Sequence, residues 1–186
     1  GASLSTHAAS YNFSKIADGS GPLLAFSNAI PGSGLQSINA GGVVAFFATH
    51  DAGRRGIYRG VTAGDLVPPG TEWVSVAVTG GTYSDFNRGL PVINNLNQVA
   101  FRANKTAGGF GIFRNSTAIA SNSDGFSELN DSPAINPTTS TLAMRGSKVI
   151  VVPFSDPGFW TASAAGSYTT VVTGTSGISS DGPSIN

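Results

Sequence analysis

The chain contains no cysteine, which excludes disulfide bonds, zinc sites built from thiolates and cysteine catalysis. Charge is also scarce: 186 residues include ten basic and ten acidic side chains, and the formal net charge is zero. A chain of this kind has no strongly basic surface with which to attract nucleic acid or an anionic membrane. We therefore expect no nucleic-acid partner.

Long hydrophobic runs are missing as well. The longest, residues 42–48 and 149–154, have the length of strands and fall short of the roughly 18 apolar residues that a membrane helix needs. We expect no membrane insertion. No window of helical periodicity is free of glycine, proline or β-branched residues, so we expect almost no helix.

What remains is a series of short segments rich in Val, Ile, Phe, Tyr and Thr. Glycine, asparagine, aspartate or proline interrupts these segments about every 8–12 residues. This spacing of turn-forming residues is typical of antiparallel all-β proteins. Hydrophobic residues make up 40% of the chain, enough for a folded core. The sequence therefore predicts an all-β fold.

An internal repeat organises these segments. Residues 34–59 read GLQSINAGGVVAFFATHDAGRRGIYR, and residues 90–114 read LPVINNLNQVAFRANKTAGGFGIFR. The pairs Ile-Asn, the triplets Val-Ala-Phe and the Gly-Ile-aromatic-Arg motifs all match at one offset of 55 positions, so we interpret them as repeated units.

The repeats cover most of the chain. We place them at about 34–80, 89–125 and 131–177, with an insertion in the third at 147–157 and partial strands at 12–18 and 182–186. Each repeat has four strand-like segments, and residues 43–49 are apolar on both faces, as in a sheet covered on both sides. We predict tandem four-stranded antiparallel units resembling β-propeller blades; another stack of β-sheets or a β-solenoid is the alternative. The predicted repeat core consists of Ile38, Phe46, Ile93, Phe101, Ile112 and Ile135.

Asn39–Phe46 spell N-x-x-G-x-x-A-F. With this motif and the segments Lys15–Asp18, Gly111–Phe113 and Pro183–Asn186, the chain resembles the NxxGxxAF tandem-repeat proteins of bacteria. The second copy has Asn97 in place of the motif glycine, and the third has Thr139. The resemblance implies an exported, non-enzymatic protein of the bacterial cell surface. It supplies no site residues.

No group of residues has the spacing of a catalytic or metal site. The two histidines, His7 and His50, lie far apart, and no G-x-S-x-G motif is present. Asp124, Glu128 and Asp131 are the closest acidic group, but they lack the spacing of a calcium-binding loop. We expect no catalytic residue, no cofactor and no metal.

Four sequons occur, at Asn12, Asn104, Asn115 and Asn130. Asn104 and Asn130 fall in predicted loops, where a glycan would be tolerated. In a chain so rich in Asn, Ser and Thr, sequons also arise by accident, so both interpretations stay open.

Two functional hypotheses follow. The first is an extracellular structural or adhesive protein, the self-assembling subunit of a surface filament whose copies associate head to tail through the segment at 182–186. The second is a carbohydrate-binding or glycan-hydrolysing β-propeller, whose partner would be a polysaccharide. In the first hypothesis the recurring aromatic residues belong to the core, and in the second some of them form a sugar platform.

Overall fold

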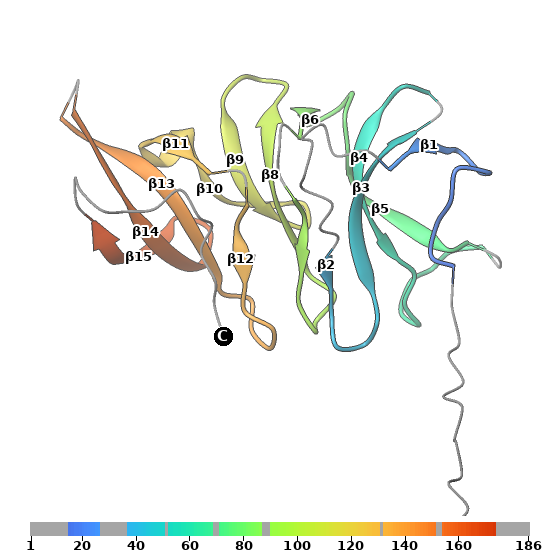
Figure 1. Cartoon of the computed structure of the whole chain (residues 1–186). Helices are drawn as coiled ribbons and strands as arrows, with labels where there is room; N and C mark the ends of the chain where they lie inside the picture. Colours follow the sequence, from blue (N-terminus) through green and yellow to red (C-terminus); the bar gives the residue numbers. More distant parts are fainter. Residues whose placement is uncertain are drawn as a thin grey trace, which may run out of the picture.

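A computed structural model describes residues 15–26, 37–50, 52–68, 71–86, 90–130, 132–151 and 154–173. The described residues form three antiparallel sheets (Figure 1), which confirms the prediction of an all-β chain. The predicted partial strand at 182–186 and the sequon at Asn12 lie outside the described residues.

Sheet 1 consists of β1 (Leu23–Ala25), β2 (Ser37–Ile38), β3 (Val44–His50), β4 (Arg55–Gly60) and β5 (Trp73–Val78). Sheet 2 consists of β6 (Tyr83–Asp85), β7 (Val92–Ile93), β8 (Val99–Lys105), β9 (Phe110–Arg114) and β10 (Thr117–Ser121). Sheet 3 consists of β11 (Phe126–Leu129), β12 (Ala134–Ile135), β13 (Leu142–Val151), β14 (Phe154–Ala164) and β15 (Ser167–Thr173), preceded by the 3₁₀ turn η1 (Asn122–Asp124).

In each sheet, one edge is formed by two short strands that pair with opposite ends of the same long strand. In sheet 2, Val99 at one end of β8 pairs with Ile93 of β7, and Lys105 at the other end pairs with Tyr83 of β6. The same division of an edge between two short strands occurs on β3 and on β13. The sheets are therefore four strands wide, as predicted, although each contains five strands.

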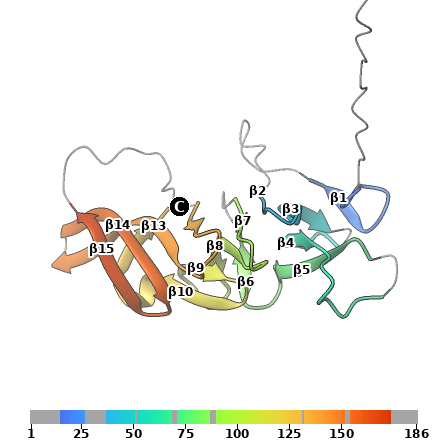
Figure 2. The same ribbon diagram turned by 90° about the horizontal axis from the view of Figure 1, so that it is seen from below.

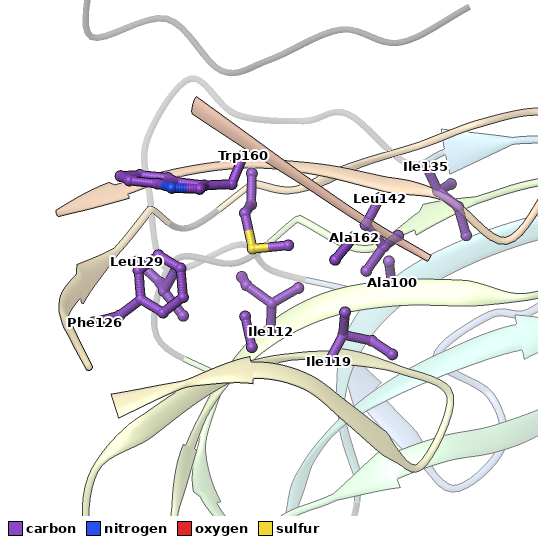
Figure 3. Packing of buried hydrophobic residues seen from close by; sticks show 11 residues of the cluster. Ala100, Ile112, Ile119, Phe126, Leu129, Ile135, Leu142, Trp160 and Ala162 are labelled. Carbon is purple, nitrogen blue, oxygen red and sulfur yellow. The ribbon is translucent and has the colours of Figure 1, made fainter. Parts of the chain in front are cut away.

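The sheets stack face to face in chain order, because β8 is apolar on both faces. Phe101 belongs to the core shared with sheet 1, whereas its neighbour Ala100 belongs to the core shared with sheet 3. In the described part of the chain the sheets form an open row and not a closed ring (Figures 1 and 2). Figure 3 shows the second core, where Ile112 and Ile119 of sheet 2 meet Leu142 and Trp160 of sheet 3.

The predicted repeat core is buried at five of its six positions: Phe46, Ile93, Phe101, Ile112 and Ile135. The prediction is wrong for Ile38, whose side chain is 65% exposed. An isoleucine at this place in β7 or β12 packs against the preceding sheet. In the described residues no sheet precedes sheet 1, so Ile38 has no such face to cover.

A different segment covers the outer face of sheet 1. Ile16 and Ala17 pack against the cluster containing Phe46, and the ring of Phe26 lies 5.7 Å from that of Phe46. The expected first strand at 12–18 is therefore wrong over Lys15–Asp18, which has no strand structure. This segment, together with Phe26 after β1, covers part of the apolar face.

The insertion predicted at 147–157 continues the hairpin of β13 and β14. Ser147 pairs with Pro157, and Lys148 pairs with Asp156. The two strands therefore extend past the ends of their counterparts in sheets 1 and 2, and the extra residues form no separate element.

Steric crowding explains why a glycine stands two residues before the aromatic residue of each motif. A Cβ atom added to Gly56 would lie 2.7 Å from the ring of Tyr58, and one on Gly111 would lie 3.2 Å from the ring of Phe113. Gly158 has the same relation to Trp160, at 3.0 Å. The aromatic ring folds back over the glycine two residues earlier on the same face of the strand, a position that leaves no room for a side chain.

Candidate functional site

The asparagine of each Ile-Asn motif organises the turn that follows it. The Oδ1 atom of Asn39 accepts hydrogen bonds from the N–H groups of Gly41 (3.0 Å) and Val43 (2.9 Å). Asn94 Oδ1 accepts the equivalent bonds from Leu96 and Gln98. Asn136 Oδ1 accepts from Thr138 and from Thr139, and the second donor is one residue nearer than in the other turns. In each turn the side-chain oxygen thus accepts hydrogen bonds from backbone N–H groups that follow it, which stabilises the turn.

The other end of the same side chain reaches the next sheet. Asn39 Nδ2 donates to the carbonyl oxygen of Asn94 at 3.0 Å and to Oδ1 of Asn97 at 2.8 Å. Asn94 Nδ2 donates in turn to the carbonyl oxygen of Thr139 at 2.7 Å. We call Asn39, Asn94 and Asn136 the asparagine row, because two of its members join adjacent sheets at one edge of the stack.

The substitution of Asn97 for the motif glycine fits this arrangement. Asn97 has a φ of 58°, and Gly42 at the same place in the first turn has a φ of 79°. Asparagine tolerates this left-handed conformation better than other non-glycine residues. In addition, its side chain accepts the bond from Asn39, so the replacement adds a contact between sheets.

Further hydrogen bonds reinforce the row. The backbone N–H of Ala40 donates to Asn95 Oδ1 at 2.9 Å, and that of Ile93 donates to Ser37 Oγ at 3.0 Å. Between sheets 2 and 3, the Ser140 hydroxyl donates to Gln98 Oε1 at 2.9 Å. These groups are amides, hydroxyls and backbone atoms, so the row supplies specific adhesion between sheets.

A separate pocket of about 160 Å³ opens beside sheet 1. It adjoins a more open groove of about 410 Å³ along β5 and the turn before β6. Arg54 and Ser75, both exposed, line the two spaces. The small pocket is lined by His50, Arg54, Tyr58, Trp73, Ser75 and Val78. Aromatic rings beside hydrogen-bonding side chains suit a sugar or another small polar ligand.

The acidic residues are engaged in local contacts. Asp124 accepts hydrogen bonds from the N–H and hydroxyl of Ser121, at 2.8 and 2.9 Å. Asp131 lies outside the described residues. Within the described ranges, no three or more His, Asp or Glu side chains gather closely enough to hold a metal ion.

Five described groups have shifted pKa values. At the surface, hydrogen bonds from Ser20 and Lys15 lower the pKa of Asp18, and the hydrogen bond to Asp18 raises that of Lys15.

The other three groups are two tyrosines and one aspartate that are less exposed. Burial, followed by the hydrogen bond and charge of Asp124, raises the pKa of Tyr168 to about 12, and burial raises that of Tyr83. Hydrogen bonds from Arg59 hold the pKa of Asp65 well below its usual range. All three side chains make contacts that stabilise the fold. Tyr168, for example, donates its hydroxyl hydrogen to the carbonyl oxygen of Ile119 at 2.9 Å.

The prediction that Asn104 lies in a loop is wrong. Asn104 lies within β8, paired with Asp85 and Phe110, and its Oδ1 accepts a hydrogen bond from Arg102. The loop expected there begins two residues later. Asn130 follows β11 outside any strand, as predicted, and Asn115 is an exposed turn residue.

Comparison of the chain with known protein families, characterised proteins and solved structures found no match. Among the described residues, no helix has the length and apolar character required to cross a membrane.

Proposed function

We propose that this chain is a non-enzymatic structural or adhesive repeat protein of the bacterial cell surface, of the kind that the NxxGxxAF resemblance implies. The observation that carries the proposal is the use of the repeat motifs. The Val-Ala-Phe and Gly-Ile-aromatic motifs supply the cores between sheets, and the Ile-Asn motifs supply the asparagine row. The motif residues that recur along the chain thus hold adjacent sheets together.

We extend the proposal to the arrangement of the sheets, which we interpret as blades of a β-propeller or of a similar stack. Successive antiparallel sheets, four strands wide and packed face to face, are what the blades of a β-propeller provide. The open row of three sheets would then be part of a larger ring or of a continuing array. Apolar cores on both faces of sheet 2 support either arrangement, because this sheet has a neighbour on each side.

Head-to-tail association of copies into a filament is the proposed mode of action. Heterologous contacts of this kind continue indefinitely when the rotation between copies does not close a ring. The test is light scattering over a range of protein concentrations, followed by negative-stain electron microscopy. We expect particles whose length grows with concentration. A single monomeric species at every concentration would overturn the filament.

Carbohydrate binding is a second candidate, favoured by the pocket beside sheet 1. Trp73 and Tyr58 pack edge to face there, with ring centroids 5.0 Å apart, and Arg54 adds a charged donor at the rim. Among the described residues that line this pocket and the adjoining groove there is no Asp or Glu, whereas most glycosidases use two carboxylates. The pocket therefore suits binding of a glycan more than its hydrolysis.

A glycan array separates the two candidates. Binding that is lost in Arg54→Ala, with unchanged melting temperature, would support the pocket. Ser127→Ala is a matched control, because Ser127 is an exposed polar residue on sheet 3, remote in sequence from the pocket lining. Absence of glycan binding together with concentration-dependent assembly would favour the structural role.

A further inference from the structure

The outer edges of sheets 1 and 2 differ in what covers them. β5 and β10 hold the same place, because in the described chain each pairs only with the strand before it and each has one extra residue in a bulge, Val76 in β5 and Ile119 in β10. The carbonyl oxygen of Ile119 accepts hydrogen bonds from the Gly166 N–H at 3.4 Å and from the Tyr168 hydroxyl at 2.9 Å. Sheet 3 therefore covers the edge of sheet 2 at this point.

The lengths of the hairpins explain this difference. β9 continues one residue past the aromatic residue of its motif, to Arg114, whereas β14 continues four residues past its own, to Ala164. The longer hairpin brings the start of β15 to the carbonyl of Ile119. The hairpin of sheet 2 is shorter, and no described residue outside sheet 1 donates a hydrogen bond to the carbonyl of Val76.

The groove of about 410 Å³ lies along this part of β5. Its lining runs without a break from Ser75 to Tyr83 and also includes Arg54. The pocket of about 160 Å³ shares Arg54, Ser75 and Val78 with the groove, so a ligand seated in the pocket can continue into the groove. Together the two spaces have the size of a small-molecule binding site.

Arg54 gives this site a positive charge. The next two arginines in the chain are paired with acids. Arg55 lies 2.9 Å from a carboxylate oxygen of Asp85, and Arg59 lies 2.6 Å from one of Asp65. Arg54 is exposed and has no ion pair with a described residue. The described lining residues include no Asp or Glu, so a carboxylate on a ligand would meet a guanidinium that is free to form paired hydrogen bonds with it.

The walls of the site suit a sugar chain. Trp73 and Tyr58 supply aromatic surface in the pocket, on which a sugar ring can pack. In the groove, the carbonyl of Val76 holds the place where that of Ile119 accepts a hydrogen bond from the Tyr168 hydroxyl. A sugar hydroxyl can donate the same bond to Val76.

We infer that this site binds an acidic oligosaccharide, a chain of uronic acid units. One ring would pack on Trp73 with its carboxylate on Arg54, and the following units would lie along β5. The inference rests on the carbohydrate-binding candidate above and names the class of glycan that this candidate would take.

The test is isothermal titration calorimetry of the intact chain with tetragalacturonate and with its methyl ester, which has the same chain length but no charge. We expect the acid to bind at least about tenfold more tightly, and the difference to disappear in Arg54→Gln. Arg54→Lys should retain part of it, because an ammonium group keeps the charge but not the paired hydrogen bonds. Lys148→Gln is the control, since it removes one positive charge from sheet 3, outside the lining, and should leave the difference unchanged.

Gly81→Leu tests the groove separately from the pocket. Nothing lies within 4 Å of a Cβ atom added to Gly81, which lines only the groove, so the leucine fits without an internal clash and narrows the groove. It should lower the affinity for tetragalacturonate about fivefold or more, because the contacts of the outer units are lost. The affinity for digalacturonate, which occupies the pocket, should not change.

Three results would contradict the inference. Equal binding of the acid and its methyl ester, or a preference for the acid that persists in Arg54→Gln, would overturn the acidic class and leave carbohydrate binding intact. Full affinity for tetragalacturonate in Gly81→Leu would overturn the path along β5. Failure of both oligosaccharides to bind would overturn the inference as a whole, and the glycan array then decides separately whether the carbohydrate candidate survives.

Discussion

The side-chain amide of Asn94 donates a hydrogen bond to the carbonyl oxygen of Thr139 at 2.7 Å and so joins the turns of two adjacent sheets. The same side chain accepts hydrogen bonds from the N–H groups of Leu96 (3.0 Å) and Gln98 (2.9 Å). Asn94 is only 1% exposed. One buried residue therefore determines both the shape of its turn and the registry of the stack.

Removal of this side chain should be costly. Asn94→Ala leaves the carbonyl of Thr139 and two turn N–H groups without their partner, and we expect the free energy of unfolding to fall by about 2–4 kcal/mol. Urea denaturation measures it. The nearest control is Asn136→Ala, which loses hydrogen bonds within its own turn, including one from the Thr138 hydroxyl, but no described bond between sheets. It should cost about 1 kcal/mol less. Equal losses would show that the bond between sheets contributes nothing.

The two phenylalanines of the Val-Ala-Phe motifs are predicted to contribute similarly to stability. Phe46 is 3% exposed and Phe101 is fully buried, and each stacks on the aromatic residue of the neighbouring strand. Replacing either by alanine should lower the free energy of unfolding by about 3–5 kcal/mol. Leu96→Ala, at a position 54% exposed, should change it by less than about 0.5 kcal/mol. A loss below about 1 kcal/mol at both phenylalanines would refute their assignment as equivalent core positions.

The glycine before the aromatic residue gives a third test. A methyl group at Gly111 would lie 2.9 Å from the carbonyl oxygen of Ala120 and 3.2 Å from the ring of Phe113. Gly111→Ala should therefore destabilise the chain by about 1–3 kcal/mol through overpacking. Gly64→Ala is the control, because nothing lies within 4 Å of its added Cβ. Thermal unfolding of the two variants should separate them clearly, and equal melting temperatures would contradict the steric explanation.

Much of the fold could be predicted because the long strands carry strong patterns. Val-Ala-Phe and Gly-Ile-Phe mark β8 and β9, and their repetition sets the number of units. The first strand of each sheet was missed, since β1 and β6 contain only three residues and β11 only four. A signal existed: two large apolar residues three positions apart precede each repeat, as Leu23/Phe26, Tyr83/Phe86 and Phe126/Leu129.

The candidate site was harder to predict. Asparagine before a glycine-containing turn predicts the bonds that Asn39 makes within its own turn. Its bonds to Asn94 and Asn97 depend on how the sheets stack, which no local pattern specifies. The exposure of Ile38 has the same origin, because its burial depends on a preceding sheet and not on the motif that contains it.

The ion pair of Arg59 and Asp65 leads to a prediction about pH. The carboxylate of Asp65 accepts hydrogen bonds from both terminal nitrogens of Arg59, at 2.7 and 2.6 Å, and from the backbone N–H of Thr62 at 2.7 Å. The side chains of the pair are only 16% and 15% exposed. These hydrogen bonds, with Arg59 contributing most, depress the pKa of Asp65 in the folded state.

A depressed carboxyl pKa stabilises the fold above the unfolded pKa of about 4, and the stabilisation declines as pH falls below it, because the unfolded chain takes up the proton first. Asp65→Asn should therefore lower the free energy of unfolding by about 1–3 kcal/mol at pH 7, and the difference from the unmodified protein should shrink by about 1 kcal/mol at pH 3. Urea unfolding at the two pH values measures this. Glu128→Gln is the control, since the Glu128 side chain is exposed on β11, and it should leave the free energy of unfolding almost unchanged at either pH. A difference between Asp65→Asn and the unmodified protein that stays constant from pH 7 to pH 3 would show that the ion pair does not shift this pKa.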